Sequence, residues 1–295
     1  MRKPKAEPGL VSYAELLVRA ALAEDIGSGD ITTNAIVRKN ETGDAEFMAK
    51  EDMIVAGLFI PEMVFRILDK KSVFKARVKE GARAKKGHVI ATVHGSLAAL
   101  LTGERVALNF LQRLSGIATK THEFAGKIKK TKVRLLDTRK TTPCMRSLEK
   151  YAVMAGGGTN HRFGLFDLVL IKDNHIKAAG SVTAAIEAVK RRYRDAVPIE
   201  VEVTDLDELK EALASGADII MLDNMGIPMI RKAVKLIEGA AFIEVSGNIN
   251  LDNIGRVAKE GMDFISVGAL THSARAVDIS MEVVSLCGTR ARKSR

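Results

Sequence analysis

The sequence predicts an α/β protein in two parts: an N-terminal part that mixes helices with antiparallel strands, and a larger part that forms an incomplete α/β barrel. Two patterns predict this division. Strands in the first part alternate apolar with charged residues, which is typical of a half-buried antiparallel sheet. From Val133 onward, short apolar strands alternate with helical segments, and such repeated βα units indicate a parallel sheet.

In the first part, an amphipathic helix is predicted from Ser12, which begins a capping box, to about Glu24. Residues 73–79 and 88–95 are predicted to pair as antiparallel strands. The pattern is helical from residue 96 to about 129, where the Ser115-Gly116 pair could interrupt the helix. This part is therefore predicted to be of the α+β kind.

The second part contains six apolar segments that we predict to be parallel strands. They are VRLLD (133–137), FDLVLIKD (166–173), IEVEV (199–203), DIIMLD (218–223), FIEVSG (242–247) and DFISVG (263–268). An open doubly wound sheet would need a glycine fingerprint after its first strand, where this chain has DTRKT. A barrel with fewer than the usual eight strands is therefore the prediction. The predicted domains are residues 1–115 and 116–272, with a C-terminal helix at about 273–295 that packs back on the first domain.

Composition and charge disfavour a nucleic-acid-binding protein and a membrane-spanning protein. The net charge is +10, but the basic clusters are scattered and lack interleaved aromatic residues, which disfavours nucleic-acid binding. No apolar run approaches the roughly 20 residues that span a membrane. The charged start and the two cysteines predict a cytoplasmic protein without a disulfide framework. A basic surface suits a small acidic substrate.

Polar side chains gather where the predicted barrel strands end, which is the catalytic face of such barrels. The residues at these strand ends are Thr138, Arg139, Lys140, Lys172, Glu202, Asp223, Ser246, Gly247 and Gly268. The pair His161-Arg162, in the loop AGGGTNHRFG, adds further cationic groups. Any one of these residues could be an ordinary polar terminus, and His161 could be a satisfied core histidine. Taken together, the set predicts an active site.

The charges at the strand ends predict the kind of ligand. The cationic groups suit carboxylates or phosphates, which arginine binds through two parallel N–H bonds. Glu202 and Asp223, on neighbouring strands, suit Mg²⁺ held partly by substrate oxygens. Ser246-Gly247 and Gly268 are each predicted to end a strand and open a helix, which would make a phosphate site. Glu200 is predicted to form an internal ion pair instead. The inferred ligand is a phosphorylated polyanion.

Several sequence blocks resemble one family, that of quinolinate phosphoribosyltransferase, also called nicotinate-nucleotide pyrophosphorylase (carboxylating). These blocks are EDIGSGDIT, ERVALNFLQRLSGIAT, DTRKTTP, LEKYAV, GGGTNHRFGLFDLVLIKDNHI, IEVEV, MLDN, SGNI and SVGALTHS, within residues 13–285. The resemblance implies an N-terminal α/β sandwich domain plus an incomplete TIM-like α/β barrel, the type II phosphoribosyltransferase fold. It also implies transfer of phosphoribose from phosphoribosyl pyrophosphate to quinolinate, with Mg²⁺ and loss of CO₂, in de novo NAD biosynthesis.

The resemblance also implies individual roles. Quinolinate would be bound by Arg105, Thr138, Arg139, His161, Arg162 and Lys172. Lys140 would lie beside the donor, Glu202 and Asp223 would hold Mg²⁺ and the ribose, and Ser246, Gly247, Gly268 and His272 would bind a phosphate. Such enzymes are homodimers or larger assemblies, in which Arg105 would act in the neighbouring subunit's site. Cys144 departs from the family, which usually has glycine after this proline.

Two alternatives stay open at this point. One is a transferase of the same fold that takes nicotinate or another heteroaromatic acid, although five cationic groups exceed what one carboxylate needs. The other is a basic nucleic-acid-binding or scaffold protein, whose binding would weaken steeply with salt.

Overall fold

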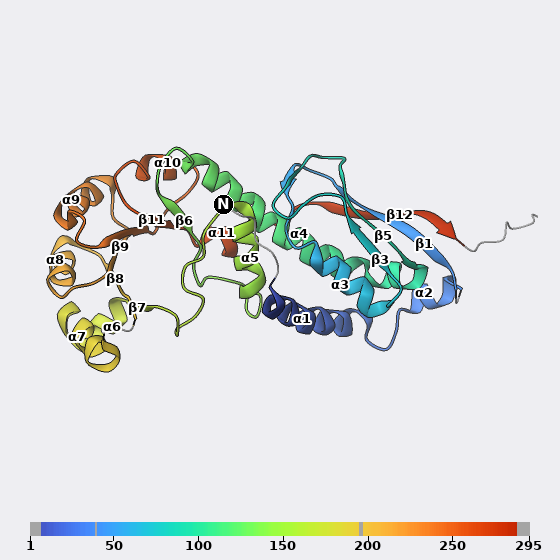
Figure 1. Cartoon of the computed structure of the whole chain (residues 1–295), viewed down its shortest axis with the longest axis horizontal. Coiled ribbons are helices and arrows are strands. Elements are labelled where there is room, and N and C mark those ends of the chain that lie inside the picture. The colour runs from blue at the N-terminus through green and yellow to red at the C-terminus, as the bar shows by residue number, and fades with distance from the viewer. Residues whose placement is uncertain (1–6, 39, 195–196, 288–295) are drawn as a thin grey trace, which may run out of the picture. The chain divides into compact units, whose positions relative to one another are not determined.

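The computed structural model describes residues 7–38, 40–194 and 197–287 (Figure 1). The chain divides into two compact units, and both are assembled from separate segments. Unit 1 consists of residues 1–122, 147–157 and 274–295, and unit 2 consists of residues 123–146 and 158–273. The predicted boundary at residue 115 therefore lies close to the first division, whereas the return of residues 147–157 to unit 1 is not part of the prediction.

Unit 1 contains a four-stranded antiparallel sheet in the order β12-β1-β5-β3. Its strands are β1 (Thr42–Ala49), β3 (Val73–Ala76), β5 (Val89–Ser96) and β12 (Ile279–Cys287), and β2 (Met53–Ile54) pairs separately with β4 (Arg83–Ala84). Every second residue of β1, including Ala45 and Phe47, is buried, so one face of the sheet forms the core. The predicted pairing of the segments around 73–79 and 88–95 is confirmed.

The helices of unit 1 are α1 (Pro8–Ile26), α2 (Ile31–Ile36), α3 (Phe59–Leu68), α5 (Arg146–Gly156) and the start of α4 (Leu97–Ile128). The first helix begins at Pro8 rather than at the predicted Ser12. Proline is favoured in the first helical turn because its missing N–H would be unsatisfied there in any case.

The predicted C-terminal helix is wrong for the described residues. Residues Ile279–Cys287 form strand β12, which lies antiparallel to β1 along its whole length (Figure 1). The segment ISMEVVSLC alternates in a way that suits a strand, with Ile279 and Met281 buried and Ser280 and Glu282 more exposed. Pairing with β1 satisfies its backbone groups. Residues 288–295 of the predicted helix lie outside the described part of the chain.

Helix α4 continues without interruption through Ser115-Gly116, so the suggested break is not found. Glycine stands at this position for another reason: a Cβ at Gly116 would lie 2.0 Å from the main-chain oxygen of Arg275. We expect Gly116→Ala to lower the free energy of unfolding by about 2–3 kcal/mol through overpacking. The test is to compare the thermal denaturation of Gly116→Ala with that of Gly126→Ala. Gly126 lies in the same helix, and a Cβ there would meet no atom within 4 Å.

Unit 2 contains a six-stranded sheet in the order β6-β11-β10-β9-β8-β7, with parallel pairing at every step. The strands are β6 (Arg134–Leu136), β7 (Val169–Ile171), β8 (Ile199–Val203), β9 (Ile219–Asp223), β10 (Phe242–Ser246) and β11 (Phe264–Ser266). The order follows the chain around a ring that stays open between β6 and β7. The predicted incomplete barrel of six strands is confirmed.

Helices follow the barrel strands along the chain: α6 (Asp173–Ala179), α7 (Val182–Tyr193), α8 (Leu206–Ala214), α9 (Ile227–Ile237), α10 (Ile254–Val257) and α11 (Ala269–His272). Apolar residues such as Val201, Ile220 and Val245 are buried in the strands, but so are the carboxylates Glu200 and Glu244. In the described residues, no helix is both long and apolar enough to span a membrane.

Candidate active site

A cavity of about 580 Å³ lies at the carboxyl ends of the strands of unit 2. The predicted site residues that line it are Thr138, Arg139, Lys140, His161, Arg162, Lys172, Glu202, Asp223, Ser246, Gly247, Gly268 and His272. These residues come from all six strand ends, from the loop after Thr159 and, in the case of His272, from α11. The structure therefore brings together every predicted site residue except Arg105, while their individual roles stay predictions.

Two guanidinium groups in the cavity wall have donors that the protein does not use. The Nε atoms of Arg139 and Arg162 are buried and have no hydrogen-bond partner. Arg162 is only 9% exposed and donates from Nη1 to the main-chain oxygen of Leu168 at 3.1 Å. Burial, followed by the charge of Arg139, lowers the pKa of Arg162. Two cations whose Nε donors are buried and unused favour an anionic ligand.

The turn after β6 is held by the polar residues of DTRKTTP. The buried Asp137 accepts a hydrogen bond at 2.8 Å from the main-chain N–H of His161. Thr138 Oγ1 accepts one at 3.1 Å from the main-chain N–H of Lys140. Asp137 therefore ties the turn that carries Arg139 to the loop that carries Arg162.

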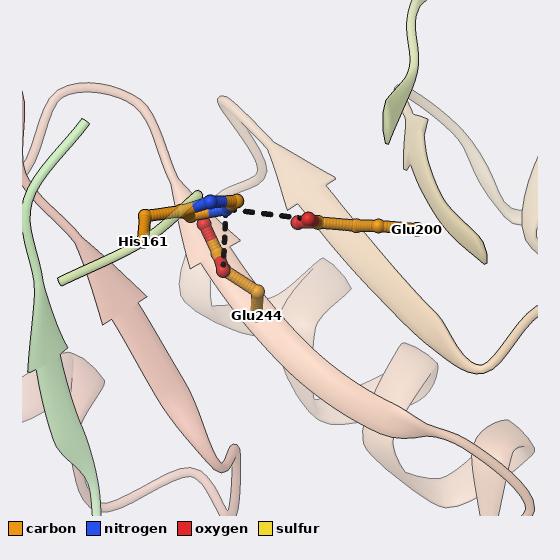
Figure 2. Close-up of side chains that lie close together, drawn as sticks. All are labelled: His161, Glu200 and Glu244. Carbon is orange, nitrogen blue, oxygen red and sulfur yellow. Dashed lines mark ion pairs between the residues drawn. The ribbon is translucent and has the colours of Figure 1, made fainter. Parts of the chain in front are cut away.

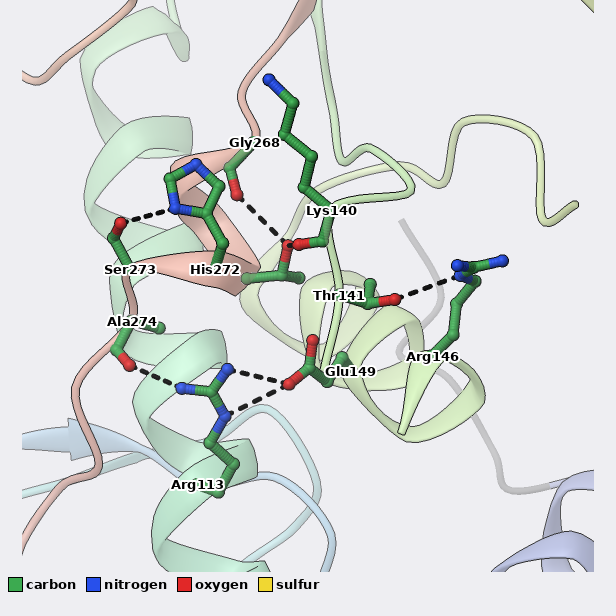
Figure 3. Close-up of polar contacts among 10 residues, drawn as sticks. Arg113, Lys140, Thr141, Arg146, Glu149, Gly268, His272, Ser273 and Ala274 are labelled. Carbon is green, nitrogen blue, oxygen red and sulfur yellow. Dashed lines mark hydrogen bonds and ion pairs between the residues drawn. The ribbon is translucent and has the colours of Figure 1, made fainter. Parts of the chain in front are cut away.

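Arg146 holds the same turn from its other side and is absent from the predicted site. Its Nε donates to Thr141 Oγ1 at 3.1 Å, as Figure 3 shows, and its Nη1 donates to the main-chain oxygen of Phe163, also at 3.1 Å. A third contact joins Nη2 to the main-chain oxygen of Arg139 at 3.4 Å. Arg146 thus connects the two loops without lining the cavity itself.

His161 lies between two buried carboxylates, which supports the predicted internal ion pair of Glu200 (Figure 2). Its Nε2 is 3.2 Å from Glu200 Oε2 and 3.4 Å from Glu244 Oε2. Burial by itself lowers the pKa of His161, but contacts with the two carboxylates outweigh this effect and raise the pKa to about 10. The main-chain N–H of Arg162 points at Nδ1 at 2.7 Å, which opposes a second proton there. The raised pKa favours a ring protonated on both nitrogens, whereas this contact needs an unprotonated Nδ1. The 2.7 Å geometry decides for a single proton, on Nε2 between the two carboxylates.

Glu202 and Asp223 are placed where oxygen ligands for Mg²⁺ are expected. Both line the cavity, on the neighbouring strands β8 and β9. Glu202 forms an ion pair with Lys172, and Asp223 accepts a hydrogen bond at 2.7 Å from the amide of Asn224. Mg²⁺ prefers one or two carboxylates together with water and substrate phosphates, so this donor set fits the ion.

Lys140 and α11 lie next to each other in the cavity wall. Thr271 Oγ1 donates to the main-chain oxygen of Lys140 at 2.8 Å. A Cβ at Gly268 would lie 3.0 Å from Lys140 Cδ and 3.2 Å from His272 Cδ2, so glycine allows these two side chains to approach (Figure 3). His272 contacts Ser273 Oγ through Nδ1 at 2.6 Å.

The prediction that Ser246-Gly247 opens a helix is wrong, because α10 begins only at Ile254. Gly247 instead adopts a φ of 89° in a tight loop, where a Cβ would lie 2.2 Å from Asn224 Oδ1. The same Oδ1 accepts a hydrogen bond from the Asn248 amide at 3.0 Å. Close contact between two strand ends therefore determines this loop, whereas Gly268 does precede α11 as predicted.

Arg105 is the one predicted site residue outside the cavity lining. It lies on α4 in unit 1, and 60% of its side chain is exposed. Its recorded ion pair is a 4.0 Å contact with the adjacent Glu104. This exposure is consistent with a role toward another molecule, which is considered below.

Cys144 is exposed and adopts a φ of 61°, a left-handed conformation that favours glycine. This conformation is compatible with the glycine that the resemblance implies for this position. The left-handed region costs a residue with a Cβ about 1–2 kcal/mol, partly offset by the greater entropy that glycine loses on folding. We therefore expect Cys144→Gly to raise the free energy of unfolding by about 0.5–1 kcal/mol. A higher urea midpoint with unchanged steepness would confirm it.

The fold and the cavity define a class of protein: an α/β-barrel enzyme for polyanionic substrates. The model of the family's C-terminal domain, "Quinolinate phosphoribosyl transferase, C-terminal domain", matches residues 117–282, and its N-terminal counterpart matches residues 30–115. The chain belongs to the quinolinate phosphoribosyltransferase family.

Individual relatives agree with this assignment. The chain is 46% identical over 260 residues to a probable nicotinate-nucleotide pyrophosphorylase (carboxylating) of Bacillus subtilis, covering 88% of this chain and 90% of that protein. It is 42% identical over 300 residues to the chloroplastic enzyme of that name from Arabidopsis thaliana, covering 95% and 85%. The crystal structure of NadC from Streptococcus pyogenes superposes with a TM-score of 0.91 at 42% identity, covering 96% and 99%.

Proposed function

We infer that this protein transfers phosphoribose from phosphoribosyl pyrophosphate to quinolinate with decarboxylation, giving nicotinate mononucleotide, pyrophosphate and CO₂. Membership of the family supports this reaction, which serves de novo NAD biosynthesis. The observation that carries the inference at the site is a pair of buried, unused Nε donors, one on Arg139 and one on Arg162. A rigid dicarboxylate can satisfy both, because each carboxylate can accept two N–H bonds from one arginine.

The reaction requires two bond exchanges. The bond from the ribose C1 to pyrophosphate breaks, the leaving oxygen keeps the electron pair, and the ring nitrogen of quinolinate forms the new bond to C1. The adjacent carboxylate then leaves as CO₂, and the ring carbon takes a proton, because the positively charged ring stabilises the carbanion. Neither exchange needs a protein nucleophile. The tasks of the protein are positioning and electrostatic stabilisation.

The cavity residues can be assigned to these tasks. We propose that Arg139, Arg162 and Lys172 bind the carboxylates of quinolinate, assisted by Thr138 and His161. Lys140 and His272, which approach each other across Gly268, would bind phosphate oxygens of the donor together with Ser246 and Gly247. Glu202 and Asp223 would stabilise the positive charge that develops on the ribose.

We propose Mg²⁺ as the metal, with Glu202 and Asp223 as its protein ligands. When bound, it would supply positive charge to the pyrophosphate oxygens. Lys172 would have to leave Glu202 for both residues to serve as proposed, since the two are paired in the ligand-free protein.

The test of the function is an assay of purified protein with phosphoribosyl pyrophosphate, Mg²⁺ and either quinolinate or nicotinate. We expect pyrophosphate and CO₂ to be released together, and only with quinolinate. Equal or faster turnover of nicotinate without CO₂ would favour the alternative of a monoacid transferase. The second alternative, a nucleic-acid-binding protein, predicts affinity for nucleic acid that falls steeply with salt and needs neither substrate.

We propose that the enzyme works as a homodimer or larger assembly in which Arg105 reaches the neighbouring subunit's cavity. The cavity is lined by unit 2 alone, and Arg105 is exposed on unit 1, which supports this proposal. A cytoplasmic location stays a prediction.

A complementation experiment tests the shared site. Arg105→Ala and Lys172→Ala should each be nearly inactive, whereas subunits mixed under dissociating conditions and reassembled should regain up to about a quarter of wild-type activity, because one cavity in each mixed dimer keeps both residues. Each variant refolded alone is the control. Absence of recovery, with exchange verified by mass, would place Arg105 in its own subunit's site or outside any site.

A further inference from the structure

Two carboxylates are buried in the barrel interior where a hydrophobic core would be expected. Glu200 on β8 is 0% exposed, and Glu244 on β10 is 1% exposed. Both oxygens of Glu200 and Oε1 of Glu244 are buried and accept no hydrogen bond of good geometry. Burying a carboxylate without compensation is costly, and such groups persist when they are paired. Their shared partner is the imidazole of His161 (Figure 2).

We propose that Glu200 and Glu244 are positioning residues for the quinolinate site, which they shape through His161. The proposal rests on the proposed function and extends it from the predicted binding residues to the carboxylates around that imidazole, of which Glu244 also lines the cavity.

The contacts of His161 leave its ring little freedom to reorient. Nε2 faces both carboxylates, at 3.2 and 3.4 Å, and Nδ1 accepts the main-chain N–H of Arg162 at 2.7 Å. The main-chain N–H of His161 donates to Asp137 at 2.8 Å. The backbone is thus held at the N–H groups on both sides of His161, and the imidazole is held at both of its nitrogens. Because the side chain of Arg162 starts at the peptide that joins it to His161, the orientation of the imidazole determines where its guanidinium can lie.

Glu200 also supplies counter-charge to the neighbouring cations of the cavity wall. Arg139 and Arg162 both line the cavity, and the charge of Arg139 lowers the pKa of Arg162 while that of Glu200 opposes this effect. Without a dianion in the cavity, these like charges repel each other at low dielectric. Negative charge buried next to them stabilises the arrangement before the substrate arrives, which is the preorganisation that binding needs.

A metal centre is the competing explanation, because one ligand atom from each of His161, Glu200 and Glu244 lies within 4.8 Å of the others. The environment of Nδ1 argues against it. A histidine that binds a metal through Nε2 carries its proton on Nδ1 and donates it to an acceptor. Here Nδ1 faces an N–H donor instead, so a metal on Nε2 would leave the ring without a proton. The cluster is therefore arranged to hold a proton on Nε2.

The experiment compares Glu200→Gln, Glu244→Gln and the double variant with wild type and with Glu260→Gln. Glu260 pairs with Arg231 on the surface of the same unit and lies outside the cavity, which makes it the matched control. The measurements are KM and kcat for both substrates, the Kd of quinolinate by calorimetry, and the melting temperature.

We expect each single variant to raise KM and Kd for quinolinate by about 10-fold, and the double variant on the order of 100-fold, since hydrogen bonds to charged groups have this size. The kcat and the KM for phosphoribosyl pyrophosphate should change less than about 2-fold, because lost ground-state binding raises KM alone. Glu244→Asp, which keeps the charge, should recover part of the affinity. Glu260→Gln should match wild type.

Other results would overturn the proposal. A lower melting temperature with unchanged Kd for quinolinate would make the two carboxylates purely structural. An equal rise in KM for quinolinate and for phosphoribosyl pyrophosphate would show that the two carboxylates do not act specifically on the quinolinate site. One equivalent of Zn²⁺ retained by dialysed wild type and lost in the single variants would establish a metal centre. Wild type that binds quinolinate without turning it over would contradict the proposed function while leaving the positioning role measurable through Kd.

Discussion

Replacing Arg139 with leucine is expected to reduce kcat/KM for quinolinate by about 30- to 5,000-fold, the kinetic equivalent of about 2–5 kcal/mol. The guanidinium of Arg139 lines the cavity, and its buried Nε has no hydrogen-bond partner in the ligand-free protein. Leucine removes the two-pronged contact and leaves one substrate carboxylate facing an apolar wall. Most of the loss should appear in the KM for quinolinate, with the KM for phosphoribosyl pyrophosphate little changed.

The stability of this variant separates lost chemistry from lost structure. Arg139 is one cause of the lowered pKa of Arg162, so its removal relieves repulsion, and the melting temperature should stay level or rise. Arg139→Lys should retain an intermediate activity, because lysine keeps the charge but not the planar fork. Arg231→Leu, on the surface of the same unit, is the matched control. If Arg139→Leu bound quinolinate as wild type does, Arg139 would have no role in carboxylate binding.

Glu149→Leu is expected to lower the free energy of unfolding by about 3–5 kcal/mol, because it leaves the partly buried Arg113 without its carboxylate partner. Glu149 is 0% exposed and accepts hydrogen bonds from Arg113 Nη2 at 2.8 Å and from Nε at 3.2 Å. Nη1 of the same arginine donates to the main-chain oxygen of Ala274 at 2.6 Å (Figure 3). These contacts join the three segments of unit 1 at one point.

The measurement is urea denaturation followed by far-ultraviolet circular dichroism, since the chain has no tryptophan to report by fluorescence. The double variant with Arg113→Leu should recover part of the loss, because an apolar pair can replace a buried ion pair. The exposed pair Glu15–Arg19 provides the control: Glu15→Gln should change the free energy of unfolding by less than about 0.5 kcal/mol. Equal effects at both pairs would contradict the argument from burial.

The periodicity of apolar residues predicted the strands whose formation depends on local sequence. The six barrel strands and the β3–β5 pair of unit 1 were predicted, because alternation and buried apolar runs are visible in the sequence, whereas β1 and β12 were not. The polar residues that follow these strands then identified the cavity residues, since the carboxyl ends of parallel strands meet at one edge of the sheet. Arg139 and Lys172 are far apart in the sequence, yet their positions at strand ends are sufficient to place both in one cavity.

What the sequence did not predict depends on contacts over long distances. The segment 279–287 forms a strand because β1 offers it an edge, and its short alternation is a weak local signal for a strand. Gly116 is explained by one distant carbonyl oxygen, and Gly247 by a neighbouring strand's asparagine side chain. Glu244 was missed as a partner of His161. The only signal was a shared feature of IEVEV and FIEVS, each of which carries a glutamate inside an apolar strand.

The pairing of β12 with β1 also has a consequence for the order of folding. A ribosome releases residues 42–49 long before residues 279–287, and all of unit 2 is made in between. The first sheet must therefore wait with one edge unpaired, which exposes it to other chains during synthesis. A fragment ending at residue 122 would keep that open edge permanently and would also lack α5. The barrel, in contrast, can assemble before the unit that precedes it is complete.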